Sequence, residues 1–244
     1  MIEEEHIVIT DNYNEIHKYV QDAAIKANRS PKDVLLIAVS KTKPESAIKE
    51  LYDIGVRDFG ENKVQELCGK YENLPKDIKW HLIGHLQRNK VKYIVDKVHL
   101  IHSVDSVRLA EEISSEAVKK NVVVDILIQV NVALEETKFG LDSDETENII
   151  RTIANLPNIR IKGLMTIAPF VEDANDNRKI FKKLKQLSVD IAAKNIDNVC
   201  MDVLSMGMSG DYIVAIEEGA TMVRVGTSIF GERNYNKTEQ GENI

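Results

Sequence analysis

The sequence predicts an α/β protein built as a single (β/α)8 TIM barrel, with an extra helix before the first strand. Eight short apolar runs alternate along the 244 residues with segments whose apolar side chains follow helical spacing. Alternating strands and helices pair in parallel through right-handed crossovers, and eight such units close a barrel. A doubly wound open sheet is the alternative, but it ordinarily has fewer strands and a glycine-rich first turn, which this chain lacks.

Each element follows from the same two periodicities. Apolar spacing predicts the first helix at about 11–28, and the β-branched run at 34–41 predicts the first strand. Pro44 stands where the next helix begins and Gly55 where it ends. The other predicted strands are 57–62, 79–84, 98–102, 122–130, 159–167, 199–204 and 221–225, and the other helical stripes lie at 64–71, 91–95, 107–117, 149–156, 180–191 and 212–216.

Composition narrows the classes of protein that this chain could be. No linker divides it, so 1–233 is expected to form one domain and 234–244 a polar tail. The 32 basic and 39 acidic residues are interspersed, which disfavours nucleic-acid and membrane partners. Two cysteines outside any CxxC pattern indicate neither disulfides nor a metal site. The first residues do not have the pattern of a signal peptide, and the sequence contains no run of 18 apolar residues. We expect a cytoplasmic protein, and the lack of an apolar seam favours a monomer.

The first predicted strand stops at a lysine. Alternation over 34–41 places Lys41 on the same inward face as Ile37 and Val39. The pKa of a lysine amine is ordinarily near ~10.4, and desolvation lowers it, so that the neutral amine can condense with an aldehyde. A lysine that only reaches the solvent at the rim is the plainer alternative. Lys43 has the same parity but follows the end of the run, so it is the weaker candidate, suited to rim charge or a transient second site.

Two segments late in the chain suit a phosphate group. The loop at 204–211 and the end of the last strand at 223–228 are both rich in glycine and hydroxyl residues, and loops after strands seven and eight are the usual phosphate site of such barrels. Barrel closure brings the eighth strand beside the first. A small phosphorylated aldehyde could therefore span the two sites, and pyridoxal 5'-phosphate (PLP) matches this description, with Lys41 as its internal aldimine and Arg224 facing its ring.

Several segments together resemble a known family. The match covers nearly all of 11–233 without large gaps, and the segments that carry it are 38–44, 59–66, 80–90, 102–105, 129–131, 138–140, 163–166, 204–211 and 224–231. They resemble the pyridoxal phosphate homeostasis family, the YggS/PROSC group. The resemblance implies a barrel similar to the amino-terminal domain of alanine racemase, of the fold type III PLP class, that serves vitamin B6 homeostasis.

The resemblance also implies roles for individual residues. Ser209, Gly226 and Thr227 would hold the phosphate, with Gly210 in the same loop. Arg224 would approach the ring nitrogen, and the residues that would line the pocket are Asn62, His85 and Met165. PLP-dependent apo-enzymes are the protein partners that such a homeostasis role suggests.

The chemistry favours a binding protein over an efficient enzyme. An arginine beside the pyridine nitrogen favours the unprotonated ring, which is a poor electron sink. Racemisation also needs a second base, which the racemases take from an extra β-domain and a partner subunit, and this chain has no residues left for such a domain. A PLP-dependent amino-acid racemase of low activity is the alternative. A Schiff-base aldolase without a cofactor is the third hypothesis, although it would place its lysine among acid and base partners.

Overall fold

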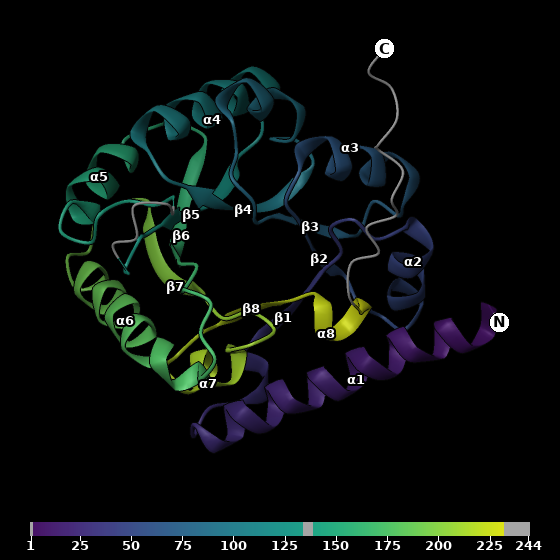
Figure 1. Ribbon diagram of the computed structural model, residues 1–244. Helices are drawn as coiled ribbons and strands as arrows, with labels where there is room; N and C mark the ends of the chain where they lie inside the picture. The colour runs from purple at the N-terminus through teal and green to yellow at the C-terminus, as the bar shows by residue number, and fades with distance from the viewer. Residues whose placement is uncertain (1, 134–138, 232–244) are drawn as a thin grey trace, which may run out of the picture.

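Eight parallel strands form a closed barrel in chain order in the computed structural model, which describes residues 2–133 and 139–231 (Figure 1). The strand pairs run from β1 with β2 through β7 with β8, and β1 pairs with β8 to close the ring. The strands are β1 (Leu35–Val39), β2 (Asp58–Glu61), β3 (Lys79–Leu82), β4 (Val98–Val104), β5 (Val124–Gln129), β6 (Ile159–Met165), β7 (Val199–Ser205) and β8 (Met222–Val225). The predicted barrel is confirmed, and the open-sheet alternative is wrong.

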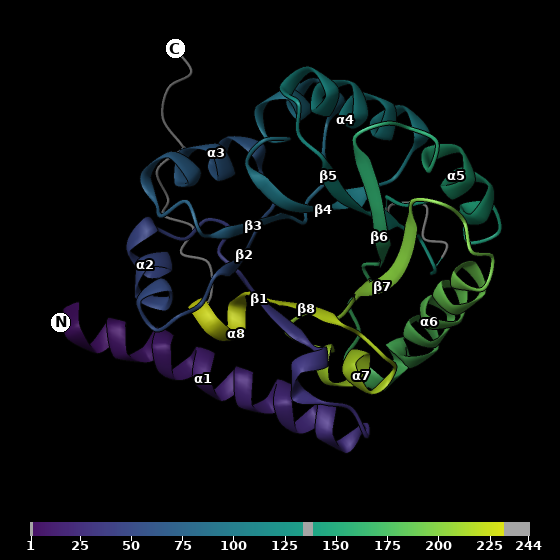
Figure 2. The same ribbon diagram turned by 180° about the vertical axis from the view of Figure 1, so that it is seen from behind.

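Helices surround the barrel on the outside (Figures 1 and 2). They are α1 (Ile2–Lys26), α2 (Glu45–Asp53), α3 (Val64–Asn73), α4 (Val107–Lys120), α5 (Thr146–Ile153), α6 (Arg178–Ala192), α7 (Tyr212–Glu217) and α8 (Thr227–Phe230), with 3-10 helices at Pro31–Asp33, Arg88–Tyr93 and Ala174–Asn177. The extra helix, α1, lies on the outside of the barrel, beside α2, α7 and α8 (Figure 1). Its buried stripe of Ile16, Val20 and Ala24 explains why it packs there.

The apolar side chains of each strand divide between two layers. Leu36 and Ala38 of β1 belong to the large core between strands and helices. Ile37 lies on the opposite face, inside the barrel, where its Cγ2 would be 3.1 Å from a Cβ added at Gly60 of β2. Alternation along a pleated strand therefore supplies both layers, as the sequence predicts.

Three details of the helices differ from the expected pattern. The first helix begins at Ile2, nine residues earlier than expected. The stripe at 91–95 overlaps the 3-10 helix Arg88–Tyr93 and does not form an α-helix, because the amide of Ile94 bonds to the carbonyl of Val91, three residues back. The single-turn helix α8 has too few residues for a periodic signal and was not predicted. The proposed tail at 234–244 lies outside the described residues, and in the described part no helix has the length and apolarity needed to cross a membrane.

Candidate functional site

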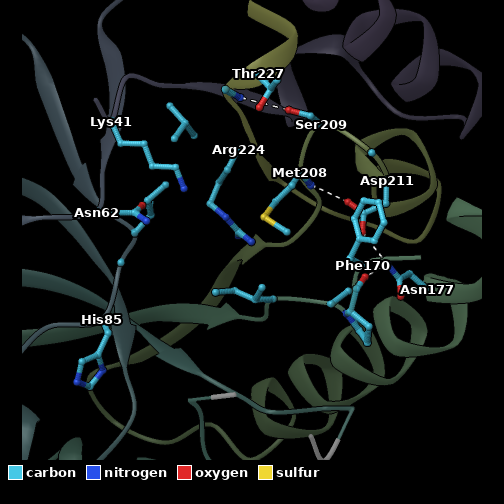
Figure 3. Close-up of a pocket in the computed structure, with 18 of the residues that line it drawn as sticks. Lys41, Asn62, His85, Phe170, Asn177, Met208, Ser209, Asp211, Arg224 and Thr227 are labelled. Atoms are coloured by element: carbon cyan, nitrogen blue, oxygen red, sulfur yellow. Dashed lines mark hydrogen bonds between the residues drawn. The ribbon is translucent and has the colours of Figure 1, made fainter. Parts of the chain in front are cut away.

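A cavity of about 660 Å³ lies at the carboxyl ends of the strands, within the range of small-molecule sites. It collects residues from several strand ends that are far apart in the sequence (Figure 3). The predicted site residues that line it are Lys41, Asn62, His85, Ser209, Gly210, Arg224, Gly226 and Thr227. The structure therefore brings eight of the nine predicted positions to one cavity.

Lys41 is presented by a tight turn and not by the strand itself. β1 ends at Val39, and the carbonyl of Ser40 accepts a hydrogen bond from the amide of Lys43 at 3.0 Å. Thr42 within this turn has φ 64°, a left-handed conformation that is strained for a β-branched residue. Its amide donates to Glu66 Oε1 at 2.6 Å, which helps to hold the turn. The strand assignment of Lys41 is thus wrong, although its side chain is half-buried and directed into the cavity (Figure 3).

A buried ionic cluster supports this turn from behind. Lys70 Nζ donates to the carbonyl of Ser40 at 2.8 Å and to Glu61 Oε1 and Glu66 Oε1, each at 2.7 Å. Ser40 Oγ donates to the same Glu61 oxygen at 2.6 Å. Burial raises the pKa of the Glu61 carboxyl, and its other oxygen, Oε2, has no partner among the described residues. The cluster therefore holds the Lys41 turn at Ser40 directly and at Thr42 through Glu66.

Lys43, the weaker candidate amine, also lines the cavity but is engaged elsewhere. Its Nζ donates to the carbonyls of Phe230 at 2.8 Å and Gly231 at 3.1 Å, at the end of α8. Burial lowers the pKa of Lys43. These bonds tie the Lys41 turn to the helix that follows Gly226.

Arg224 brings a positive charge into the centre of the barrel. Its side chain is buried, with Nη1 donating to Ser205 Oγ at 2.6 Å and Nη2 to the carbonyl of Thr166 at 2.9 Å. Burial lowers the pKa of Arg224 to about 10, so the guanidinium remains charged at neutral pH. In the part of the chain that the structure describes, no carboxylate forms an ion pair with it. An anionic ligand in the cavity would therefore gain from this charge.

The two glycine- and hydroxyl-rich segments meet as predicted. The Ser209 hydroxyl accepts a long hydrogen bond from the amide of Gly226, at 3.4 Å, which joins the loop after β7 to the end of β8 (Figure 3). A Cβ at Gly226 would lie 3.2 Å from the carbonyl oxygen of Val39, so glycine lets β8 end close against β1. Around Gly210 there is open space. This arrangement leaves room for a phosphate next to the Lys41 turn.

Asp211 is committed to holding the loop after β7. Its Oδ1 accepts from the amide of Met208 at 2.7 Å, and its Oδ2 accepts from Asn177 Nδ2 at 2.9 Å. Asn177 also donates to the carbonyl of Pro169, so the loops after β6 and β7 are joined. Asn177 was not predicted as a site residue, since an isolated asparagine before a helical stripe carries no sequence signal.

The far wall is aromatic and polar. His85 stacks on Phe139 with ring centroids 3.9 Å apart, and its Nδ1 lies 3.3 Å from Asp105 Oδ2. Phe170 is 97% exposed beside the mouth of the cavity. Met165 is placed differently from the other predicted site residues: it is fully buried, packs with Leu100 and Leu127 inside the barrel, and does not line the cavity. The pleat of β6 turns its side chain down into the interior.

The fold and the lysine-bearing cavity define the class of protein. The family model of the alanine racemase N-terminal domain matches residues 11–234. An alanine racemase of Clostridium difficile 630 has the same fold, with a TM-score of 0.74 at 15% identity, covering 93% of this chain and 57% of that chain.

Nearer relatives define the family. The pyridoxal phosphate homeostasis protein of Aquifex aeolicus is 48% identical over 217 residues, which is 88% of this chain and 94% of that protein. PipY of Synechococcus elongatus, solved with PLP bound, has a TM-score of 0.76 at 36% identity and covers 87% of this chain and 99% of that chain. The chain belongs to the pyridoxal phosphate homeostasis protein family.

Proposed function

We propose that this protein binds PLP covalently through Lys41 and serves intracellular PLP homeostasis as a carrier of the cofactor. The main observation in support is that one cavity is lined by Lys41, by the buried Arg224 and by the joined loops of Ser209 and Gly226. PLP supplies an aldehyde for the amine, an anionic phosphate for the loops and an acceptor nitrogen for the guanidinium.

The charge of the cavity supports an anionic ligand. Its charged lining residues among those described are Lys41, Lys43 and Arg224 against the carboxylate of Asp211. Both oxygens of Asp211 accept hydrogen bonds from the protein, so this carboxylate is not directed at a ligand. The cavity as a whole therefore carries an excess of positive charge, which suits an anionic ligand.

The lining gives little support to the racemase alternative. A donor such as Arg224 at the ring nitrogen disfavours protonation of the ring, so PLP here would be a weak electron sink. The His85 imidazole is the candidate second base. It stacks on Phe139 and faces Asp105, and its side chain is 40% exposed to solvent. A carrier needs neither a deep sink nor exclusion of water, and an open mouth allows PLP to pass to PLP-dependent apo-enzymes.

The test is an absorption spectrum of the purified protein with added PLP, followed by borohydride reduction and peptide mapping. We expect a visible band and a PLP label that reduction fixes on Lys41. The Lys41→Ala variant is expected to lose both, whereas Lys43→Ala, which removes the neighbouring amine, keeps the label. A label on Lys43, or none on the wild type, would contradict the proposal.

A second measurement separates the carrier from the racemase. The PLP-loaded protein is incubated with L-alanine in deuterium oxide, and the α-proton is followed by NMR. A carrier leaves the α-proton in place over hours. Exchange at enzymatic rates, lost in Lys41→Ala, would favour the racemase.

A further inference from the structure

A chain of buried hydrogen bonds crosses the barrel interior and ends on Arg224. It begins at Asp58, the first residue of β2, whose Oδ1 lies 3.0 Å from His81 Nε2. His81 Nδ1 lies 2.9 Å from His102 Nε2, and His102 Nδ1 lies 2.8 Å from Ser205 Oγ. Ser205 Oγ then accepts from Arg224 Nη1 at 2.6 Å. Four successive bonds connect the amino-terminal side of β2 with the cavity.

The two ends of the chain limit its direction. A guanidinium only donates and an ionised carboxylate only accepts, so His81 donates from Nε2 to Asp58. We assign the Ser205 hydroxyl proton to the bond with His102 Nδ1, which is the arrangement that keeps both buried rings neutral. His102 then donates from Nε2 to His81 Nδ1. In this assignment both imidazoles carry their proton on Nε2, and every bond has one donor and one acceptor.

Because the chain is buried, water cannot readily take the place of its hydrogen bonds. The side chains of His81, His102 and Ser205 are fully buried, and that of Asp58 is 13% exposed. Burial lowers the pKa of His102 well below its usual range, which agrees with a neutral ring. In surroundings of low polarity, hydrogen bonds in a row polarise one another, so the carboxylate at one end strengthens the acceptor at the other.

We propose that His81, His102 and Ser205 are positioning residues, which link the Arg224 guanidinium to Asp58 and hold it directed at the ring nitrogen of the cofactor. The role toward PLP rests on the function proposed above. Arg224 forms no ion pair with a carboxylate among the described residues, and Asp211 acts on it only through space, so this chain is its hydrogen-bonded link to a carboxylate. None of the three residues lines the cavity, and each acts through Arg224.

The direction of the chain is tested first, on the protein without any ligand. Nitrogen-15 NMR of the histidine rings at neutral pH is expected to show His81 and His102 neutral, with Nε2 protonated in both. A charged ring, or a proton on Nδ1 of either histidine, would overturn the chain as described. This measurement stands even if the protein fails to bind PLP, so failure of the chain and failure of the proposed function can be told apart.

The positioning role is tested with Ser205→Ala, which removes a hydroxyl and little volume. Loss of a hydrogen bond to a charged group predicts PLP affinity about 10- to 150-fold weaker. We also expect an altered chemical shift of the ring nitrogen in 15N-labelled PLP, while the borohydride label stays on Lys41. Ser114→Ala is the matched control, because Ser114 is also buried but donates to the carbonyl of Pro157 on the outside of the barrel.

A second variant pair tests charge separately from packing. Asp58→Asn keeps an oxygen that can accept from His81 but removes the charge, and it should shift the ring nitrogen signal in the same direction as Ser205→Ala. Asp125→Asn is its control, because Asp125 also lies at the start of a strand and pairs with Arg160 outside the chain. If Ser205→Ala and Asp58→Asn lower only the stability and leave affinity and ring signal as in the wild type, the chain is merely structural and the proposal is wrong.

Discussion

Replacing Lys70 with methionine is expected to lower the free energy of unfolding by about 3–5 kcal/mol, the cost of leaving a buried charge without its partner. Lys70 and Glu61 are both buried and form an ion pair at 2.7 Å. The variant would leave the Glu61 carboxylate with only the Ser40 hydroxyl as a donor among the described residues. Urea unfolding of wild type and variant measures the loss.

The same change should weaken the site. Lys70 also bonds to the carbonyl of Ser40 and to Glu66. The Glu66 carboxylate accepts a hydrogen bond from the amide of Thr42, the residue with the left-handed backbone. Without these bonds, the turn that presents Lys41 has less to hold it in its left-handed conformation. We therefore expect slower labelling of Lys41 by PLP in Lys70→Met, measured under conditions where the variant is still folded.

Two comparisons make this prediction specific. Lys119→Met removes an exposed lysine that pairs with Glu116 and is expected to change stability very little, because water screens the lysine charge. The double variant Glu61→Leu/Lys70→Met removes both buried charges and should lose less stability than the sum of the two single variants. A loss below about 1 kcal/mol in Lys70→Met would show that the cluster does not act as a buried ion pair.

The sequence predicts the barrel well because each of its signals is local. A run such as 34–39 must be a strand, and eight such runs with helical stripes between them leave few topologies. The phosphate segments could be placed for the same reason, since strand order alone brings the end of β8 beside β1, as the pairing of Ile37 with Arg224 confirms. Short elements such as α8 fall below the length at which periodicity is visible.

The parts of the site that sequence reasoning missed depend on partners and not on periodicity. Alternation identifies the inward face of β3 and β4, but it does not pair His81 with His102, or His102 with Ser205 more than a hundred positions later. For Met165 the resemblance to the family predicted a pocket residue, but the pleat of β6 directs its side chain into the barrel interior, away from the cavity lining. Which residues meet inside a barrel follows from strand stagger, which a single sequence does not reveal.

Gly163→Ala is expected to cost about 3 kcal/mol or more, from steric overlap and backbone strain together. Gly163 of β6 has φ +154°, and a Cβ added there would lie 1.8 Å from the carbonyl oxygen of Val203 in β7. The overlap is with backbone, so no side chain can move aside and the two strands must separate. Denaturant unfolding of the variant measures the cost.

Gly69→Ala is the matched control, because the same methyl group meets nothing within 4 Å on the exposed face of α3. There the substitution should stabilise the protein by about 0.5–1 kcal/mol, since alanine favours the helix. The contrast also bears on function. β6 leads to Thr166, whose carbonyl accepts from Arg224, so strands forced apart at Gly163 would move an acceptor of the guanidinium. Gly163→Ala should thus weaken PLP binding while Gly69→Ala leaves it unchanged, and equal effects of the two substitutions on stability would refute the close strand packing inferred here.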